Sequence, residues 1–307
     1  MGQRQKKGRP VSGWVSLDKP LGMTSTQAVS VVKRLFGAQK AGHAGTLDPL
    51  ATGCLPIALG EATKTVPFIM DGRKIYGFTV RWGEETRTDD AEGQPVATSD
   101  VRPTRAAIEA ILDQFTGEIM QVPPAFSAIK VEGERAYDLA RDGEDVVLEA
   151  RPIQIHRLDL VDMPDENTAV FAAECGKGTY VRAIARDMAR ALGTRGHVVG
   201  LRLLLVGPFD EASMIKLDDL RAAQEEGGAE GCDAHLAPVE LALGDLAEVR
   251  ISETDGARLR NGQSVLLRGR DAPENGATVF ATVAGTLVAI GEVERGELHP
   301  SRVFVGA

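Results

Sequence analysis

A single carboxylate stands in a permissive segment of this sequence. The stretch GHAGTLDPLATG, residues 42–53, contains three glycines, two threonines and one acid, Asp48. Pro49 biases Asp48 toward an extended backbone, and the glycines allow close approaches that a side chain would block. These residues predict a shaped loop that presents Asp48. From this segment alone, a reactive site and a structural turn both remain open.

A second pattern that could take part in chemistry is a row of arginines later in the chain. Arg182, Arg186 and Arg190 recur every four residues. An apolar stripe accompanies them at helical spacing: Val181, Ile184, Ala185, Met188 and Leu192. This spacing predicts a helix over residues 179–192, with Thr179 as its cap. On spacing alone, a solvated charged face is the simpler interpretation of the arginines.

Asp48 and the arginines must be positioned by a fold that contains both helices and strands. Residues 24–36 predict a helix because Thr24 and Gln27 fit a capping box. A second helix is expected from Thr104, with an apolar face formed by Ile108, Ile111, Leu112 and Phe115. Segments rich in β-formers predict strands over residues 75–82, 153–161 and 170–175. The fold class is therefore α+β, built on mixed or antiparallel strands.

The chain is long enough for about two domains of roughly 150 residues each. Residues 248–307 contain β-rich pieces joined at Asn261-Gly262 and Ala284-Gly285, and they predict a small β-barrel-like module. Within the first part, Pro123-Pro124 opens a polar segment that extends to Val146. Its composition fits either a solvated excursion or a binding lobe.

The net charge of −9 does not exclude a nucleic-acid partner, because the acids are concentrated in one stretch. Residues 209–247 contain ten acids and only two bases, Lys216 and Arg221. The first nine residues contain four bases and no acid, so residues 1–12 are expected to form a basic, disordered tail. The remaining surface can therefore hold a basic cleft.

The scattered cysteines and histidines argue against a disulfide framework or a metal site. Cys54, Cys175 and Cys232 lie far apart without paired spacing, and the five histidines are equally dispersed. No run of about 18 apolar residues predicts a membrane span, and the first residues lack the apolar core of a signal peptide. We expect a cytoplasmic protein that holds no metal.

Several motifs, taken in order, resemble one enzyme family closely. They are LDKPLGMTS (17–25), GHAGTLDPLATGCLPIALGEATK (42–64), KIYGFTVRWGEETRTDDAEG (74–93), VPPAFSAIKVEGERAYDLARDGEDV (122–146), CGKGTYVRAIARDMARALG (175–193) and HVVGLRLLLVGPF (197–209). This set is similar to the bacterial tRNA pseudouridine synthases of the TruB family, which modify uridine 55 in the TΨC arm. The resemblance spans most of residues 14–209.

The resemblance implies both a fold and a reaction. The expected catalytic domain, residues 13–247, has a mainly antiparallel central sheet with flanking helices. Pseudouridine formation breaks the N1–C1′ bond of uridine, turns the uracil and joins C5 to C1′, without a cofactor. Asp48 resembles the family's catalytic carboxylate. It would act either as a nucleophile or as the base that gives a glycal intermediate, and the sequence leaves both routes open.

Other roles follow from the same resemblance. Tyr76 matches the active-site tyrosine that stacks on the base, and Arg182 matches the arginine that pairs with the carboxylate. Leu201 would supply an apolar wall. Lys19 and Pro20 belong to the first motif, which would support the active-site loop.

The resemblance also implies RNA binding. A stacked uridine must be extruded, at a cost of a few kcal/mol. His43 matches a histidine inserted near the extruded bases, and Tyr180 matches an aromatic that lines the pocket. An RNA-gripping insertion is expected at about residues 123–150, with phosphate contacts from Lys130, Arg135 and Arg141.

The implied partner is the T-arm stem-loop of tRNA, bound by a monomer with no obligate protein partner. Residues 248–307 resemble, more weakly, the PUA module that holds the acceptor region. One position departs from the family pattern, since Leu203 stands where relatives commonly carry arginine.

Two other functions compete with isomerisation. An RNA chaperone that assists tRNA folding would use the same cleft and would keep its whole function without the Asp48 carboxylate. A nucleoside hydrolase would release free uracil, although a typical glycosidase needs a second catalytic carboxylate, and no motif locates one here.

Overall fold

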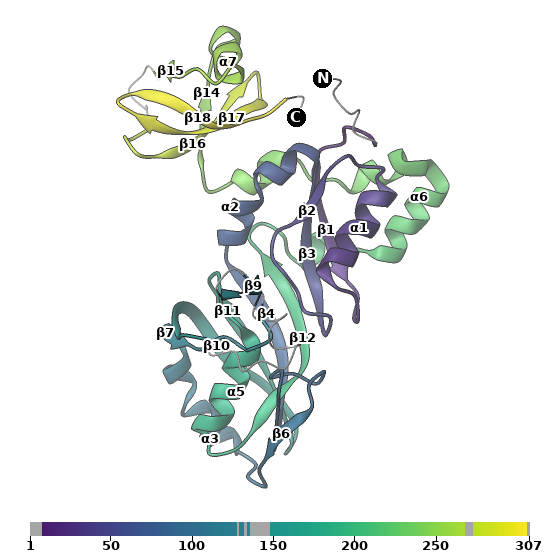
Figure 1. Cartoon of the computed structure of the whole chain (residues 1–307), viewed down its shortest axis with the longest axis vertical. Coiled ribbons are helices and arrows are strands. Elements are labelled where there is room, and N and C mark those ends of the chain that lie inside the picture. The colour runs from purple at the N-terminus through teal and green to yellow at the C-terminus, as the bar shows by residue number, and fades with distance from the viewer. Residues whose placement is uncertain (1–7, 128, 132–133, 136–147, 268–272, 306–307) are drawn as a thin grey trace.

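The computed structural model describes residues 8–127, 129–131, 134–135, 148–267 and 273–305. A nine-stranded sheet runs through the centre of the molecule, and a five-stranded sheet lies at one end (Figure 1). The larger sheet has the spatial order β13 (Ile215–Lys216), β1 (Gly13–Lys19), β3 (Ala51–Leu59), β12 (Gly196–Val206), β4 (Lys74–Trp82), β11 (Thr168–Cys175), β10 (Arg151–Asp165), β7 (Gly117–Gln121). The short strand β2 (Ala41–His43) pairs with β3.

This sheet is mixed but mainly antiparallel, as the sequence predicts. Among the described strands of this sheet, only the β1–β13 and β3–β12 pairs are parallel. Strand β12 is the bridge between the two halves of the sheet, because it pairs with β3 on one side and with β4 on the other.

Two apolar cores cover the sheet. One groups residues of β1 and β3 with α1 (Ser25–Leu35) and α6 (Leu217–Gly231), and the other groups β4, β10 and β11 with α5 (Val181–Ala191). Tyr76 and Leu201 pack against both cores. Figure 1 shows α1 and α6 beside β1–β3, and α5 beside β10 and β12. The residues expected to line the site therefore lie where the two cores meet.

Shorter elements complete the described part of the first 246 residues. The helices are α2 (Val66–Asp71) and α3 (Arg105–Glu109), and 3₁₀ turns cover Gly60–Lys64, Leu112–Phe115, Glu211–Ser213, Cys232–His235 and Val239–Leu243. Two hairpins pair β5 (Glu84–Thr86) with β6 (Pro95–Thr98) and β8 (Lys130–Val131) with β9 (Glu134–Arg135). Within the described residues, no helix is long and apolar enough to cross a bilayer.

The helix predictions had mixed outcomes. Helix α1 has the predicted capping box between Thr24 and Gln27. The helix expected from Thr104 is capped as predicted but ends after five residues. Beyond Ile108, the hydrogen bonds change to the tighter 3₁₀ pattern, since Ile111 N–H donates to Ile108 O. This pattern aligns residues three apart, so Leu112 and Phe115 still pack against the core.

The prediction of Thr179 as a helix cap was wrong. Helix α5 starts at Val181, with Tyr180 in the cap position and no side-chain cap. Gln121, on the edge strand β7, bonds both backbone groups of Tyr180: its Oε1 accepts from Tyr180 N–H at 2.9 Å, and its Nε2 donates to Tyr180 O at 3.1 Å. The Thr179 hydroxyl instead donates to Gly176 O.

The C-terminal residues form a β-rich unit with its own core. Its strands follow the order β14 (Ala247–Arg250), β16 (Thr278–Val283), β17 (Thr286–Glu294), β18 (Glu297–Val303), β15 (Val265–Leu266), with α7 (Glu253–Arg260) packed against them. Phe304 is buried in the core of the larger sheet, and Lys64 Nζ donates to Val303 O at 2.6 Å. The unit is thus attached to the segment that follows β3.

Candidate active site

The backbone around Asp48 is held by contacts from the N-terminal motif. Leu47 N–H donates to Ser25 Oγ at 2.9 Å, and Ser25 Oγ donates back to Leu47 O at 3.1 Å. Pro49 O accepts from Gly22 N–H at 2.9 Å. The β2–β3 loop is therefore fixed to the start of α1 on both sides of Asp48.

A close strand contact follows the loop. Gly53 has a φ of +96°, and a Cβ at this position would lie 2.2 Å from Leu203 O. Only glycine allows β3 and β12 to approach in this way. Leu203 is itself buried in the core, and the adjacent Arg202 pairs with Asp18 at 2.9 Å.

Asp48 forms an ion pair with Arg182 from the first turn of α5. Asp48 Oδ2 lies 2.8 Å from Arg182 Nε. The other guanidinium nitrogens are also engaged, since Nη1 donates to Thr88 O at 2.6 Å and Nη2 to Phe126 O at 2.9 Å. Asp90 Oδ2 lies 3.6 Å from Nη1. The guanidinium is thus oriented by groups from three separate segments.

The arginine row is not a solvated face, and that interpretation was wrong for two of its members. Arg182 and Arg186 are buried, and Arg186 Nη1 lies 2.9 Å from Asp89 Oδ2. Only Arg190 is substantially exposed, where it pairs with Glu85. Each of the three arginines has a carboxylate partner within residues 85–90, and the helical spacing of the arginines cannot reveal this.

A cavity of about 90 Å³ opens beside the ion pair. Asp48, Tyr76, Arg182 and Leu201 line it, together with Thr46, Leu47, Thr179, Tyr180 and Val181. Tyr76 and Leu201 come from neighbouring strands, because β4 pairs with β12. Burial raises the pKa of the Tyr76 phenol above its usual value, so this hydroxyl keeps its proton. The structure thus brings the three residues expected to be catalytic together with the expected apolar wall.

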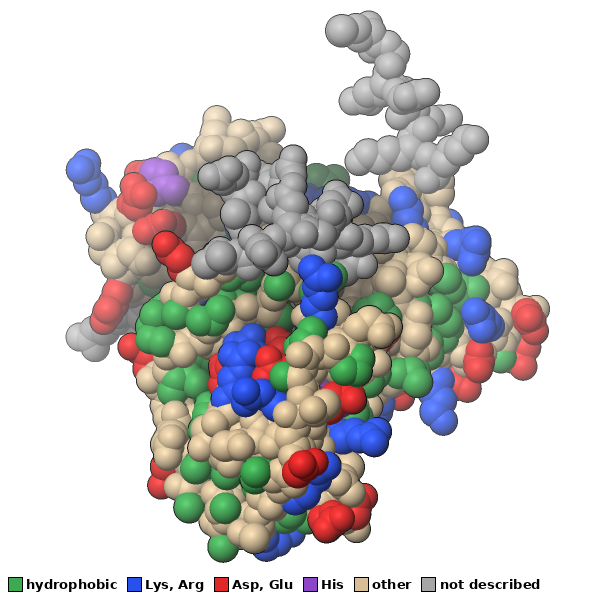
Figure 2. All heavy atoms as spheres, turned by 60° about the horizontal axis from the view of Figure 1, so that its bottom comes forward, with side chains coloured by type: hydrophobic (Ala, Val, Ile, Leu, Met, Phe, Trp, Pro, Cys, Tyr) green, Lys and Arg blue, Asp and Glu red, His purple; other side chains and the backbone are tan. Residues whose placement is uncertain are grey.

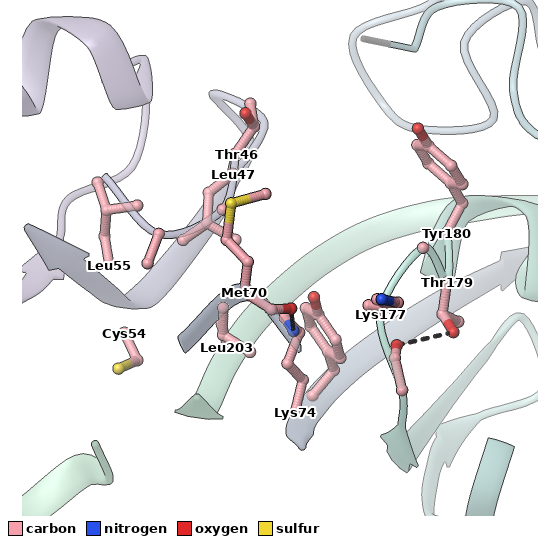
Figure 3. A pocket seen from close by; sticks show the side chains of 15 residues that line it. Thr46, Leu47, Cys54, Leu55, Met70, Lys74, Lys177, Thr179, Tyr180 and Leu203 are labelled. Atoms are coloured by element: carbon pink, nitrogen blue, oxygen red, sulfur yellow. Dashed lines mark hydrogen bonds between the residues drawn. The ribbon is translucent and has the colours of Figure 1, made fainter. Parts of the chain in front are cut away.

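A larger cavity of about 240 Å³ continues from the first and shares Tyr76, Thr179 and Tyr180 with it. In Figure 3, Leu47, Met70 and Leu203 line one side, and Thr179 and Tyr180 lie on the other. Lys74 and Lys177 also line this cavity. Both cavities are open to solvent.

Lys19 lies behind the loop rather than in the cavity. Its side chain is fully buried, and Nζ donates to Met23 O at 2.6 Å, Pro20 O at 3.0 Å and Pro49 O at 3.5 Å. Burial lowers the pKa of Lys19 to about 8, and the charge of Asp48 opposes this shift. Pro20 is exposed. The ammonium thus connects the first motif to the residue that follows Asp48.

The two residues expected near extruded bases are placed differently. Tyr180 lines both cavities and a third one, which Arg151 also lines. His43 donates from Nδ1 to Gly45 O at 2.6 Å and lines none of these three cavities. In the described structure, His43 therefore acts as a hydrogen-bond donor within its own loop.

Part of the expected RNA-gripping insertion lies outside the described residues. Lys130 and Arg135 pair through their backbones in the β8–β9 hairpin. Arg141 lies outside the described residues. The predicted phosphate contacts of these three residues therefore stay predictions.

The electrostatics of the site favour a basic carboxylate. Burial raises the pKa of the Asp48 carboxyl above its usual value, while the charges of Arg182 and Lys19 oppose this shift and Asp90 reinforces it. Figure 2 shows positive and negative side chains side by side at the centre of one face. Across the described residues, no group of three or more His, Cys, Asp or Glu side chains is arranged to hold a metal ion.

Some residues of the site carried no expected role. Ser25 and Thr88 act through backbone contacts with the loop and with Arg182, and Asp90 lies against the same guanidinium. Ser25 closes the first motif, and the other two belong to TRTDDAEG, residues 86–93. Their membership in these motifs was the only available signal, because the contacts that place them in the site, with Leu47 and Arg182, join residues far apart in the chain.

Comparison with known proteins agrees with this architecture. The family described as "TruB family pseudouridylate synthase (N terminal domain)" matches residues 33–181. Two further models match the rest: "tRNA pseudouridylate synthase B C-terminal domain" over 182–244 and "Pseudouridine synthase II TruB, C-terminal" over 247–304. These matches define the class as a pseudouridine synthase.

Individual relatives agree over nearly the whole chain. The tRNA pseudouridine synthase B of Bradyrhizobium diazoefficiens is 64% identical over 98% of this chain and 88% of its own length. That of Agrobacterium fabrum is 58% identical over 98% and 97%. A crystal structure of a Cbf5-Nop10-Gar1 complex superimposes with a TM-score of 0.72, at 25% identity, over 95% of this chain and 84% of that one. The chain belongs to the TruB family of pseudouridine synthases.

Proposed function

We propose that this protein converts uridine 55 in the TΨC arm of tRNA to pseudouridine. The observation that carries the proposal is the Asp48 carboxylate, held by Arg182 at 2.8 Å beside Tyr76 in a cavity of a TruB-family fold. The relatives named tRNA pseudouridine synthase B support tRNA as the substrate.

The geometry suits a reaction that needs one carboxylate. The N1–C1′ bond breaks with both electrons leaving on uracil, and the uracil turns. Its C5 then bonds to C1′, after which C5 loses a proton and N1 gains one. Product and substrate have the same atoms, so no co-reactant is required. As a nucleophile, Asp48 would attack C1′, and the bond so formed would break again when C5 bonds to C1′. As a base, it would remove a sugar proton and later return it. Its raised pKa makes it a stronger nucleophile in the first role and a stronger base in the second.

The neighbouring side chains have distinct proposed tasks. Tyr76 stacks on the uracil and Leu201 forms the wall opposite, while Tyr180 contacts the base or its neighbour. Lys19 and Pro20 support the loop from behind. His43 would contact the extruded bases through its ring or Nε2, since its Nδ1 is bonded to Gly45 O.

The rest of the chain is assigned to RNA binding. Residues 13–247 would form the catalytic domain, with the insertion at about 123–150 gripping the T arm through Lys130, Arg135 and Arg141. Residues 248–307 would form a PUA-like module for the acceptor region. The disordered tail expected over residues 1–12 is wrong for the described residues 8–12, because Arg9 N–H donates to Gly37 O at 2.6 Å and the Arg9 side chain pairs with Asp233 at 2.6 Å. We expect a cytoplasmic monomer that needs no protein partner.

The test is conversion of an unmodified tRNA transcript by the purified protein, followed by mapping of pseudouridine at each uridine. We expect modification at position 55 and none in a transcript that carries cytidine there. Conversion confined to another position would refute the T-arm assignment but not the reaction class. Free uracil among the products would instead indicate a nucleoside hydrolase.

The Asp48→Asn variant distinguishes an RNA chaperone from a pseudouridine synthase. A pure tRNA-folding protein would retain its whole function in this variant, as measured by refolding of a misfolded transcript. We expect loss of pseudouridine formation with retained tRNA binding. The two readouts together also show whether folding assistance accompanies the isomerase activity.

A further inference from the structure

A second buried arginine–aspartate contact lies one helical turn beyond the first. Arg186 follows Arg182 by four residues, so the two side chains lie on the same face of α5. Arg186 Nη1 donates to Asp89 Oδ2 at 2.9 Å, and both side chains are 9% exposed. Neither residue has a part in the reaction as described above.

Both arginines bind the same two segments of the chain. Arg182 donates to Thr88 O and Phe126 O, while Arg186 binds Asp89 and donates to Val122 O at 2.8 Å. Each guanidinium therefore bridges residues 88–90 and residues 122–126. A shift of either segment at Arg186 would move the carbonyl groups that orient Arg182.

The backbone of Asp89 is fixed in an uncommon conformation. Its φ is +60°, which most residues other than glycine avoid and which aspartate tolerates better than most. Asp89 O accepts from Val198 N–H at 3.1 Å on β12. Through this turn, consecutive carboxylates face consecutive arginines, Asp89 toward Arg186 and Asp90 toward Arg182.

A buried ion pair contributes little net stability, because desolvation offsets most of the attraction. Its better-supported use is to fix geometry. We propose that Asp89 and Arg186 are positioning residues, which hold Thr88 and the 122–126 segment so that the Arg182 guanidinium stays aligned with Asp48. This inference rests on the proposed function, since it assigns a role within that same site.

The chain offers a matched control one turn further along α5. Arg190 Nη2 lies 2.6 Å from Glu85 Oε1, and this pair contacts neither residues 88–90 nor residues 122–126 in the hydrogen bonds described. Arg190→Met therefore removes an arginine–carboxylate pair from the same helix without touching the partners of Arg182.

The experiment measures single-turnover conversion and affinity for an unmodified tRNA transcript. In Asp89→Asn and Arg186→Met, we expect a rate about 10- to 100-fold lower, because small misplacements of reacting groups have effects of this size. The tRNA affinity should change less than about threefold, and Arg190→Met should match the wild type. Arg186→Lys keeps the positive charge but not the planar set of guanidinium donors, so its rate should lie between those of Arg186→Met and the wild type.

The double variant gives a second readout. If both residues act through one contact, Asp89→Asn combined with Arg186→Met should be no slower than the slower single variant. Asp89→Asn is the gentler change, since Arg186 Nε keeps its contact with Asp187 at 2.8 Å. Asp89→Asn therefore still tests the inference if Arg186→Met does not fold.

Two results would overturn the inference. One is an Asp89→Asn rate equal to that of Arg190→Met, and the other is a loss confined to tRNA affinity. A wild-type protein that forms no pseudouridine would overturn the proposed function as well. An active wild type with fully active variants overturns only the positioning role.

Discussion

Asp48 and Arg182 are paired asymmetrically with respect to solvent. Asp48 Oδ2 lies 2.8 Å from Arg182 Nε, yet the Asp48 side chain is 36% exposed and the Arg182 side chain only 6%. The arginine therefore contacts the carboxylate from the buried side, and the exposed side of the carboxylate faces the cavity. This is the orientation that a group needs if it is to reach the sugar of an extruded nucleotide.

The first prediction concerns the two members of this pair. Asp48→Asn should lower the single-turnover rate by at least about 1,000-fold, the scale seen when a reacting group is removed. Arg182→Met should lower it by about 100- to 1,000-fold, since it deletes an oriented donor. Arg182 lowers the pKa of Asp48 against the effect of burial. The acid limb of the pH–rate profile should therefore move to higher pH in Arg182→Met.

The measurement is the single-turnover rate between pH 4 and pH 8, with tRNA affinity measured separately. Arg190→Met is the control, because it removes a guanidinium from the same helix without contact to Asp48. An acid limb at the same pH in Arg182→Met and wild type would contradict the assigned role of the arginine.

The loop and its carboxylate could be read from the sequence because their signals are local. Glycine spacing and the Asp48-Pro49 pair indicate a shaped loop, and the order of the motifs supplied Tyr76 and Arg182. Segments rich in β-formers are also a local signal, and together with the predicted helices they gave the fold class.

The failures share a physical cause, which is that a tertiary partner replaced the local one. Thr179 is not the cap of α5, because its hydroxyl donates to Gly176 O and the helix begins after Tyr180, whose backbone is bonded by Gln121. The burial of Arg182 and Arg186 depends on acids in residues 85–90. Spacing within a helix cannot specify such partners.

The second prediction is a pH dependence caused by Lys19. Its pKa in the folded protein is lowered to about 8 from 10.5, mainly by burial. Above pH 8 the ammonium loses its proton, and with it the charge that faces Asp48 from behind the loop. We expect the rate of pseudouridine formation to fall as pH rises through about 8. In Lys19→Met, the rate should be lower throughout and flat between pH 7 and pH 9.

The same shift affects stability with a definite sign. Between pH 8 and 10.5, the unfolded chain binds the Lys19 proton more tightly than the folded protein does. The Lys19 contribution to the free energy of unfolding therefore rises with pH over this window. Urea unfolding at several pH values measures it, and Lys19→Met should lack this rise. An identical pH slope in both proteins would argue against the lowered pKa.

The third prediction separates two adjacent residues, Ser25 and Thr24. The Ser25 hydroxyl bonds both backbone groups of Leu47, so Ser25→Ala should cost about 1–3 kcal/mol and slow the reaction by loosening the Asp48 loop. Thr24 only caps α1, so Thr24→Ala should cost about 1 kcal/mol without slowing it. Thermal unfolding and single-turnover rates measured on both variants test this. Equal rates in the two variants would show that the loop does not depend on Ser25.

The fourth prediction uses two glycines that both have positive φ. At Gly53, φ is +96° and a Cβ would lie 2.2 Å from Leu203 O, whereas at Gly193, φ is +71° and no atom lies within 4 Å of the added Cβ. Gly193→Ala should therefore cost only the backbone strain, about 1–2 kcal/mol. Gly53→Ala must also separate β3 from β12 next to the Asp48 loop, so it should lower the free energy of unfolding by more than about 4 kcal/mol. The rate of pseudouridine formation should fall in Gly53→Ala and stay unchanged in Gly193→Ala. Urea unfolding of both variants gives the comparison. Equal destabilisation would mean that the strands adjust to a methyl group and that this contact does not shape the site.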